Sequence, residues 1–329
     1  MNSVRGAFAV FCKSIEKNAW FGVLLFAVTI MLLVSAHKKL QRLNRPRPYS
    51  GSFVESFVQS SGSTSSSGVI VKHGNDMKDA FYAAVYDQLF NQKVNNAYEV
   101  GAILNKYPDI SNQTVALDVG AGTGAYMSAF IQNGITNVTG IESSSDMVAQ
   151  AKRSYPGMNI VKGNPAAASA FKPDSFTLVS VLNFEVYHIP NTEQLFSNVY
   201  AWLKPGGYFV LHLVDPRKFN AASMLGGDNA TTIPPTPTKK GAQSVMKFND
   251  FEYKSDVQIF PNDVVQFMEV FTDDKTGKVR KNVRNFKMPS PQTFIELAAG
   301  VGFNMLGQID LVKSQREHQF FYLFYKPAN

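Results

Sequence analysis

The sequence contains a single cysteine among 329 residues, and this residue, Cys12, lies near the N-terminus. A disulfide framework is therefore excluded, as is a cysteine nucleophile or a cysteine-based metal cluster in the main part of the chain. The five histidines show no spacing typical of metal ligands, such as His-Glu-x-x-His. We therefore expect no metal site.

Acidic residues are scarce at the N-terminus, where the first 75 residues include nine Lys or Arg and two Glu. The rest of the chain has 23 basic and 23 acidic residues, so the net charge of +7 belongs entirely to the N-terminal part. Proteins that bind DNA or RNA place their basic residues on the folded domain. The charge distribution therefore argues against a nucleic-acid partner.

The stretch between Lys17 and His37 has no charged residue. As a helix, this stretch is about 28 Å long, close to the thickness of the hydrocarbon core of a bilayer. It is longer than the apolar part of a signal peptide, and basic residues follow it directly. We therefore predict a short N-terminal segment over 1–18 and the transmembrane helix of a single-pass membrane protein over 19–36.

The residues that flank this predicted helix indicate its orientation. Three basic residues precede it and five follow it, which favours the cytosol for the C-terminal side and hence for the main part of the chain. Residues 37–75 are basic at first and then rich in Ser and Gly, a composition typical of a flexible linker.

The main domain is predicted over 76–329, where one or two helices up to about residue 106 are followed by alternating strand and helix patterns. The strands are expected at 114–119, 138–141, 159–162, 176–182 and 208–214, and the helices at 126–133, 146–154 and 191–203. Alternation of this kind predicts an α/β fold with a parallel sheet that has helices on both faces.

The alternation stops after residue 214. Residues 216–245 have the composition of a loop, and short runs of β-forming residues follow at 248–253, 257–260, 264–272 and 279–286, with a hairpin turn between the last two. A helix at 291–299 and strands at 304–310 and 319–326 complete the chain. We expect the segment 216–289 to be a β-rich insertion that covers the substrate.

The residues from Leu117 to Ala125 read Leu-Asp-Val-Gly-Ala-Gly-Thr-Gly-Ala and lie between a predicted strand and a predicted helix. Glycines at such a bend let the backbone turn tightly and approach a ligand, and the helix N-terminus offers N–H donors. Glu142, at the end of the next predicted strand, can accept hydrogen bonds from both hydroxyls of a ribose. The glycine pattern also fits a dinucleotide site, so a nicotinamide-dependent oxidoreductase is one alternative.

Four stretches in this order resemble motifs of the class I, Rossmann-like methyltransferases that use S-adenosylmethionine, in particular their small-molecule type. They are Leu117–Ala125, Gly140–Met147, Gly163–Asn164 and Leu203–Leu211. The resemblance covers about 80–329. It implies a seven-stranded sheet with a reversed last strand and a β-rich insertion after the fifth strand.

The resemblance also implies S-adenosyl-L-methionine as the cofactor. The glycine-rich loop is expected to bind its methionine part, Met147 to pack on the adenine, and Asn164 to contact the adenine amino group. The full set of expected cofactor-binding residues is Asp118, Gly120, Ala121, Gly122, Thr123, Gly124, Glu142, Ser143, Met147, Asn164 and Asn183.

Methyl transfer is an in-line displacement, so the protein mainly aligns the reacting atoms. A general base is needed only if the acceptor still has a proton at attack. Glu185, Tyr187 and His188 follow the fourth strand, at the edge of the sheet where ligands bind, and are the candidate catalytic residues. The Asn/Asp-Pro-Pro-Tyr/Phe motif of DNA amino-methyltransferases is replaced at this place by Asn183-Phe-Glu-Val, which again argues against nucleic acid.

The sequence therefore indicates an enzyme that methylates a nitrogen or an oxygen of a small-molecule or lipid-linked acceptor. A membrane-anchored interaction protein that binds the cofactor without turnover is the second hypothesis. The nicotinamide-dependent oxidoreductase is the third.

Overall fold

The structure is a computed structural model that describes residues 28–32, 34–35, 69–90, 93–107, 109–218, 231–238 and 241–328. The chain divides into two compact units, Met1–Arg47 and Pro48–Asn329. In the first unit, residues 28–32 and 34–35 are helical. The described residues include no helix that is both long and apolar enough to cross a bilayer, and most of the span predicted at 19–36 lies outside them.

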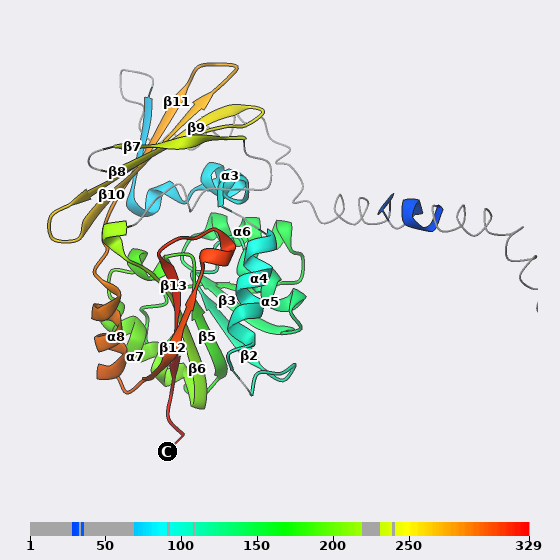
Figure 1. The fold of residues 1–329 in the computed structure, drawn as a ribbon, viewed down its shortest axis with the longest axis vertical. Helices are drawn as coiled ribbons and strands as arrows, with labels where there is room; N and C mark the ends of the chain where they lie inside the picture. Colours follow the sequence, from blue (N-terminus) through cyan, green and yellow to red (C-terminus); the bar gives the residue numbers. More distant parts are fainter. Residues whose placement is uncertain are drawn as a thin grey trace, which may run out of the picture. The chain divides into compact units, whose positions relative to one another are not determined.

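A seven-stranded sheet forms the centre of the second unit, with the strand order β12-β13-β6-β5-β2-β3-β4 (Figure 1). Its strands are β2 (Val115–Val119), β3 (Asn137–Glu142), β4 (Asn159–Lys162), β5 (Phe176–Val181), β6 (Leu203–Val214), β12 (Asn304–Asp310) and β13 (Gln319–Tyr325). β13 is antiparallel to both its neighbours, β6 and β12, and the pairs among β2 to β6 are parallel. The predicted sheet with a reversed last strand is confirmed.

Helices cover both faces of this sheet. α4 (Lys93–Leu104), α5 (Ala125–Gln132) and α6 (Ser145–Ser154) bury apolar side chains against one face, and α7 (Thr192–Trp202) and α8 (Pro291–Gly300) against the other. Successive residues of β2 point to opposite faces of the sheet. Ala116 therefore packs in the apolar cluster with α4, α5 and α6, and Leu117 in the cluster with α7 and α8. Burial on both faces explains why the parallel strands read as continuous apolar runs.

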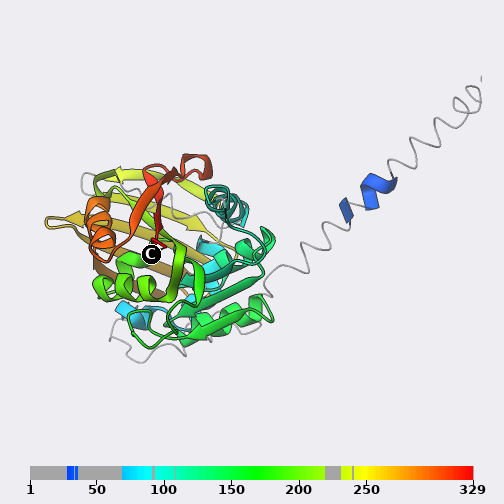
Figure 2. The ribbon, with the colours of Figure 1, turned by 90° about the horizontal axis from the view of Figure 1, so that it is seen from below.

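A second, six-stranded sheet, here called the cap sheet, has the order β1-β11-β10-β9-β8-β7 and lies above one end of the first sheet, with α3 (Ala80–Phe90) between them (Figures 1 and 2). Its strands are β1 (Val69–His73), β7 (Thr231–Thr238), β8 (Gly241–Lys247), β9 (Phe251–Phe260), β10 (Val264–Asp273) and β11 (Val279–Lys287). Its apolar side chains cluster with Phe81 and Tyr82 of α3 and with Met147 of α6.

The cap sheet corrects three expectations. The prediction of a loop over 216–245 is wrong in part, because β7 and β8 lie there. Pro234 and Pro235 concealed β7, which tolerates them because it is an edge strand whose register shifts between Ile233 and Thr236. The runs 248–253 and 257–260 belong largely to one strand, β9. Finally, β1 lies inside the predicted linker and pairs in parallel with β11, so the cap is not built from the insertion alone.

One buried cation ties the cap sheet to the chain that leads into α3. Arg280 of β11 is fully buried, and its Nη1 donates to both carboxylate oxygens of Asp79, at 3.0 and 2.9 Å. Its Nη2 donates to the carbonyl oxygen of Met77 at 3.0 Å, and its guanidinium lies over the Phe81 ring. The 3-10 helix η1 (Gly74–Met77) and the start of α3 are thereby fixed beneath the cap sheet.

Candidate active site

The glycine-rich loop connects β2 to α5 through three residues with left-handed backbones, Gly120 (φ 72°), Gly122 (φ 55°) and Gly124 (φ 86°). Only glycine adopts this conformation without strain. The space beside Gly120 also excludes a side chain at this position, because a Cβ atom on Gly120 would lie 2.0 Å from Cγ of Glu185. The side chain of Glu185 therefore packs directly against the backbone of this bend.

Glu142, the last residue of β3, directs its buried carboxylate at this loop. Its Oε2 accepts a hydrogen bond from the Gly122 N–H at 3.0 Å, and its Oε1 accepts from the Ser144 N–H at 2.8 Å and from the Ser143 hydroxyl at 3.2 Å. The predicted proximity of the loop and the carboxylate is confirmed. Each carboxylate oxygen has two lone pairs, so Oε2 retains capacity for one more donor.

The side chains of Lys78 and Glu185 cover the glycine-rich loop and Glu142. The Lys78 ammonium lies 3.7 Å from Glu142 Oε1 and 3.5 Å from Glu185 Oε1. Burial raises the pKa of Glu185, Lys78 lowers it, and the negative charge of Glu142 raises it again. Lys78 was not recognised from the sequence, because an isolated lysine ahead of a helix forms no motif.

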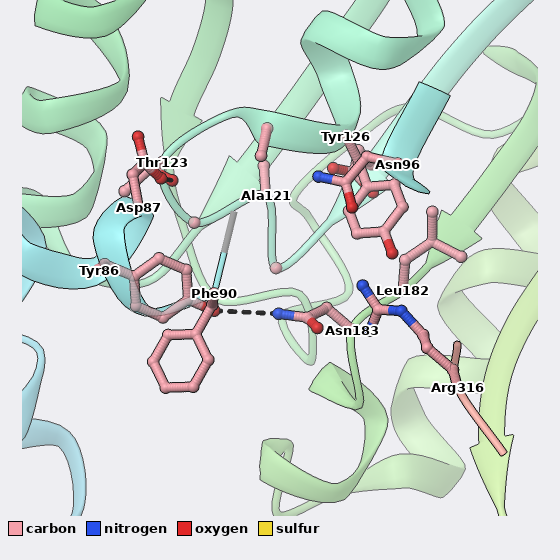
Figure 3. A pocket seen from close by; sticks show the side chains of 14 residues that line it. Tyr86, Asp87, Phe90, Asn96, Ala121, Thr123, Tyr126, Leu182, Asn183 and Arg316 are labelled. Carbon is pink, nitrogen blue, oxygen red and sulfur yellow. Dashed lines mark hydrogen bonds between the residues drawn. The ribbon is translucent and has the colours of Figure 1, made fainter. Parts of the chain in front are cut away.

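A pocket with about 450 Å³ of unfilled space opens beside the loop (Figure 3). Part of its wall comes from expected residues and part from segments distant in sequence: α3, α4 and the connection between β12 and β13. The lining residues are Tyr86, Asp87, Phe90, Asn96, Asp118, Gly120, Ala121, Gly122, Thr123, Ala125, Tyr126, Leu182, Asn183 and Arg316. We refer to it as the loop pocket.

Two carboxyl groups of the loop pocket have raised pKa values. Burial raises the pKa of Asp118 to about 7, against a hydrogen bond of 2.9 Å from the Ser180 hydroxyl that lowers it. Burial likewise raises the pKa of Asp87 to about 6, and the Thr123 hydroxyl donates to Asp87 Oδ1. The other oxygen, Oδ2, has no hydrogen-bond partner among the described residues. The pocket can therefore stabilise a cationic group at these carboxylates.

The turn after β5 joins the loop pocket to a second cavity. Asn183 and Phe184 have left-handed backbones (φ 48° and 63°), a strained conformation for residues other than glycine. The turn places Asn183 so that its Nδ2 donates to the Tyr86 hydroxyl at 3.1 Å (Figure 3). Tyr86, Phe90 and Asn183 line both spaces, so the two are adjacent.

This second cavity, here called the cap cavity, has about 600 Å³ of unfilled space between the turn after β5 and the cap sheet. Apolar side chains form most of its wall, with polar groups from Lys78, two tyrosines and Arg284. The lining residues are Lys78, Tyr82, Tyr86, Phe90, Asn183, Phe184, Glu185, His188, Val257, Phe267, Arg284, Phe286 and Met288. An apolar cavity with a few converging polar groups is typical of a small-molecule site.

His188 lies in the cap cavity with its ring at 76° to that of Phe286 and the ring centres 4.8 Å apart. Burial, and next the positive charges of Arg284 and Lys78, lower its pKa well below the usual value. The imidazole is therefore neutral at physiological pH and able to accept a proton. Its Nδ1 is buried and has no hydrogen-bond partner among the described residues.

Other expected residues lie elsewhere. Tyr187 packs in the core against Phe294, and its hydroxyl accepts a hydrogen bond from the Val214 N–H at 3.2 Å, so it lines neither cavity. Asn164 is exposed, and its side-chain oxygen accepts from the Ala166 N–H at 2.9 Å. Met147 is 1% exposed beneath α3 and the cap sheet. The predicted contact of Tyr187 with substrate is therefore not supported by its position.

No group of three or more His, Cys, Asp or Glu side chains among the described residues is arranged to hold a metal ion. The charged groups of the site are the Glu142 carboxylate at the loop, two carboxyls and Arg316 in the loop pocket, and Lys78, Glu185 and Arg284 in the cap cavity.

Residues 117–211 match the family described as "Methyltransferase domain". The chain is 31% identical over 157 residues to protein arginine N-methyltransferase 6 of Xenopus tropicalis, which is 44% of this chain and 45% of that protein. It is 33% identical over 112 residues to phosphoethanolamine N-methyltransferase 2 of Caenorhabditis elegans, which is 32% of this chain and 25% of that protein. The chain thus spans less than half the length of these two relatives.

Among solved structures, an amino pentose methyltransferase from Micromonospora echinaspora, bound to S-adenosylmethionine, superimposes with a TM-score of 0.52 at 19% identity. The match covers 75% of this chain and 97% of that chain, and it shows a shared fold. Residues 117–211 are thus similar to a methyltransferase domain, and the chain shares its fold with a solved methyltransferase structure.

Proposed function

We propose that the protein transfers a methyl group from S-adenosylmethionine to a nitrogen or an oxygen of a small acceptor bound in the cap cavity. The observation that supports this most directly is the contact between Glu142 and the glycine-rich loop, next to two adjacent cavities that share Tyr86 and Asn183. One cavity has the polar groups for the cofactor, and the other is mainly apolar.

The residues around the loop fit the cofactor. Oε2 of Glu142 can accept a hydrogen bond from a ribose hydroxyl, and Asp118 and Asp87 can pair with the ammonium of the methionine part. The cofactor supplies the activated methyl group on its sulfonium. Because Lys78 and Glu185 cover the loop, we expect both side chains to move when the cofactor binds. Of the other expected residues, the exposed Ser143 would line the nucleoside side, whereas Met147 is buried beneath α3 and the cap sheet.

The cap cavity fits an acceptor of modest size. His188 is neutral and unpartnered at Nδ1, so it can take up the proton that an amine or hydroxyl loses on methylation. Glu185 is the second candidate for this role. Phosphoethanolamine and an amino pentose, named for two of the relatives, are both small amines, which favours a nitrogen acceptor.

A second candidate function is a protein that keeps the fold without turnover. The ion pairs of Lys78 with Glu142 and Glu185 favour it, because they satisfy groups that the cofactor needs. The two functions differ in whether cofactor binding is followed by methyl transfer.

The first prediction concerns Glu142. The full-length protein should bind S-adenosylhomocysteine in calorimetry, and E142Q should bind it roughly 10- to 100-fold more weakly, because hydrogen bonds to a charged acceptor contribute about 1.5–3 kcal/mol. E296A, which removes an exposed carboxylate on α8, is the control and should bind as the wild type does. Absence of binding to the wild-type protein would refute the enzyme hypothesis.

The second prediction concerns pH. The ammonium of the cofactor pairs with ionised Asp118, whose pKa is raised to about 7 in the free protein. The affinity for S-adenosylhomocysteine should therefore rise with pH, by roughly tenfold per unit below pH 7, and level off above it. Binding should release a proton, measurable by calorimetry in buffers of different ionisation enthalpy. D118N should flatten the pH profile, and an affinity that falls as the pH rises contradicts the assignment.

The third prediction concerns His188. If it is the base, H188Q should lower methyl transfer about 100-fold or more at unchanged affinity for S-adenosylhomocysteine. Turnover can be followed as formation of S-adenosylhomocysteine in the presence of a small-molecule extract. H73Q changes an exposed histidine in the same way and should leave turnover intact. Full activity of H188Q would shift the role to Glu185 or to an acceptor without a proton to lose.

The fourth prediction concerns the N-terminus. We propose that residues 19–36 anchor the protein in a membrane, with the catalytic domain in the cytosol, because this stretch is uncharged and is followed by basic residues. The anchor would also suit a lipid-linked acceptor. The full-length protein should stay with membranes during alkaline carbonate extraction, and deletion of 19–36 should release it. Extraction of the full-length protein would disprove the anchor.

A further inference from the structure

Arg316 is a buried cation in the wall of the loop pocket that no sequence motif indicates. It follows the 3-10 helix η5 (Val312–Ser314) in the connection between β12 and β13, and it is 1% exposed. Figure 3 shows its guanidinium directed towards the space beside Leu182 and Asn183, opposite the glycine-rich loop. The C-terminal hairpin thus contributes directly to the pocket.

The contacts of Arg316 use only part of its guanidinium. Its Nε lies 2.8 Å from Oε1 of Glu99, a fully buried residue of α4. The other oxygen of Glu99 accepts a hydrogen bond from the Tyr126 hydroxyl of α5. Nη1 of Arg316 is buried and has no hydrogen-bond partner among the described residues.

An unpaired donor on a buried guanidinium is costly, because the group loses its water without gaining an acceptor. Arginine presents its donors as a planar fork, which matches the two oxygens of a carboxylate. Glu99 fixes one side of the fork, so the free donor has a defined position. An oxygen anion that enters the loop pocket would satisfy it.

The lining of the loop pocket thus combines a cation, Arg316, with two carboxyls, Asp118 and Asp87. A ligand with an ammonium and a carboxylate on neighbouring atoms, which is the α-amino-acid end of a molecule, complements such a pair of opposite charges. We propose that Arg316 binds the α-carboxylate of the methionine part of S-adenosylmethionine, while the two carboxyls bind its ammonium. This assignment rests on the proposed function.

Glu99 and Tyr126 act as positioning residues in this arrangement. They hold the guanidinium from α4 and α5, Glu99 through Nε of Arg316 and Tyr126 through Glu99. Binding of the amino-acid end therefore depends on residues from α3, α4, α5 and the β12–β13 connection, in addition to the glycine-rich loop.

The test compares two ligands by calorimetry on the full-length protein. S-adenosylhomocysteine has the amino-acid end, and 5′-methylthioadenosine has the same nucleoside and a thioether sulfur but lacks it. R316Q should weaken S-adenosylhomocysteine binding roughly 10- to 100-fold and leave 5′-methylthioadenosine binding unchanged. R217Q removes an exposed guanidinium by the same substitution and should change neither affinity.

Two further variants guard against loss of the fold. R316K keeps a positive charge but not the fork, and should show an intermediate loss for S-adenosylhomocysteine alone. Y126F should weaken the same ligand by a few-fold through Glu99. If R316Q and R316K weaken both ligands equally, or neither, the assignment is wrong while the proposed function stands. If the wild-type protein binds neither nucleoside, the proposed function falls, and this assignment falls with it.

Discussion

The site depends on the hydrogen bond between the Gly122 N–H and the Glu142 carboxylate. β2 lies between β3 and β5, and after β4 the chain returns to form β5 on the other side of β2, so the loops after β2 and β5 leave the sheet in different directions. The loop after β2 is the glycine-rich loop. It turns into the space left where the two loops diverge, and it can do so only because the backbones of Gly120, Gly122 and Gly124 are left-handed. Glu142 fixes the loop from the neighbouring strand, and the rest of the site is arranged around this contact.

Burial then determines the chemistry of the surrounding groups. The same loss of water that raises the pKa of Asp118 and Asp87 lowers that of His188. At neutral pH the site therefore combines a neutral imidazole with two carboxyl groups that titrate close to neutrality, without any metal-binding cluster in the described part of the chain. A cationic cofactor favours the ionised carboxylates, so the bound ligand changes the electrostatics of its own site.

The seven-stranded sheet could be predicted from the sequence chiefly because its central strands β2, β5 and β6 include apolar runs next to helical patterns. β1 and β7 could not, since β1 adjoins a Ser- and Gly-rich tract and Pro234 and Pro235 interrupt the pattern of β7. Their strand conformation depends on pairing with partners distant in sequence, which local propensity does not encode.

The candidate site, too, could be predicted only where its residues belong to a local sequence motif. The loop from Gly120 to Gly124 and Glu142 belong to local motifs, and the structure brings them together. Lys78 and Asp87, on the run of chain that enters and forms α3, and Arg316, in the β12–β13 connection, are charged residues without a motif. Only the packing of α3 and of the C-terminal hairpin brings them to the loop. For Tyr187 the sequence was misleading. Its position after the fourth strand suggested that it lines the site, but its side chain packs in the core.

The pairing of β1 with β11 has a consequence for access to both cavities. β1 lies at the edge of the cap sheet and pairs with one strand only, and it continues through η1 into α3. Lys78, Tyr86 and Asp87 all lie on this run of chain. Its detachment would therefore open the loop pocket and the cap cavity in a single movement. Access to both cavities would then depend on a segment that precedes the seven-stranded sheet in the sequence.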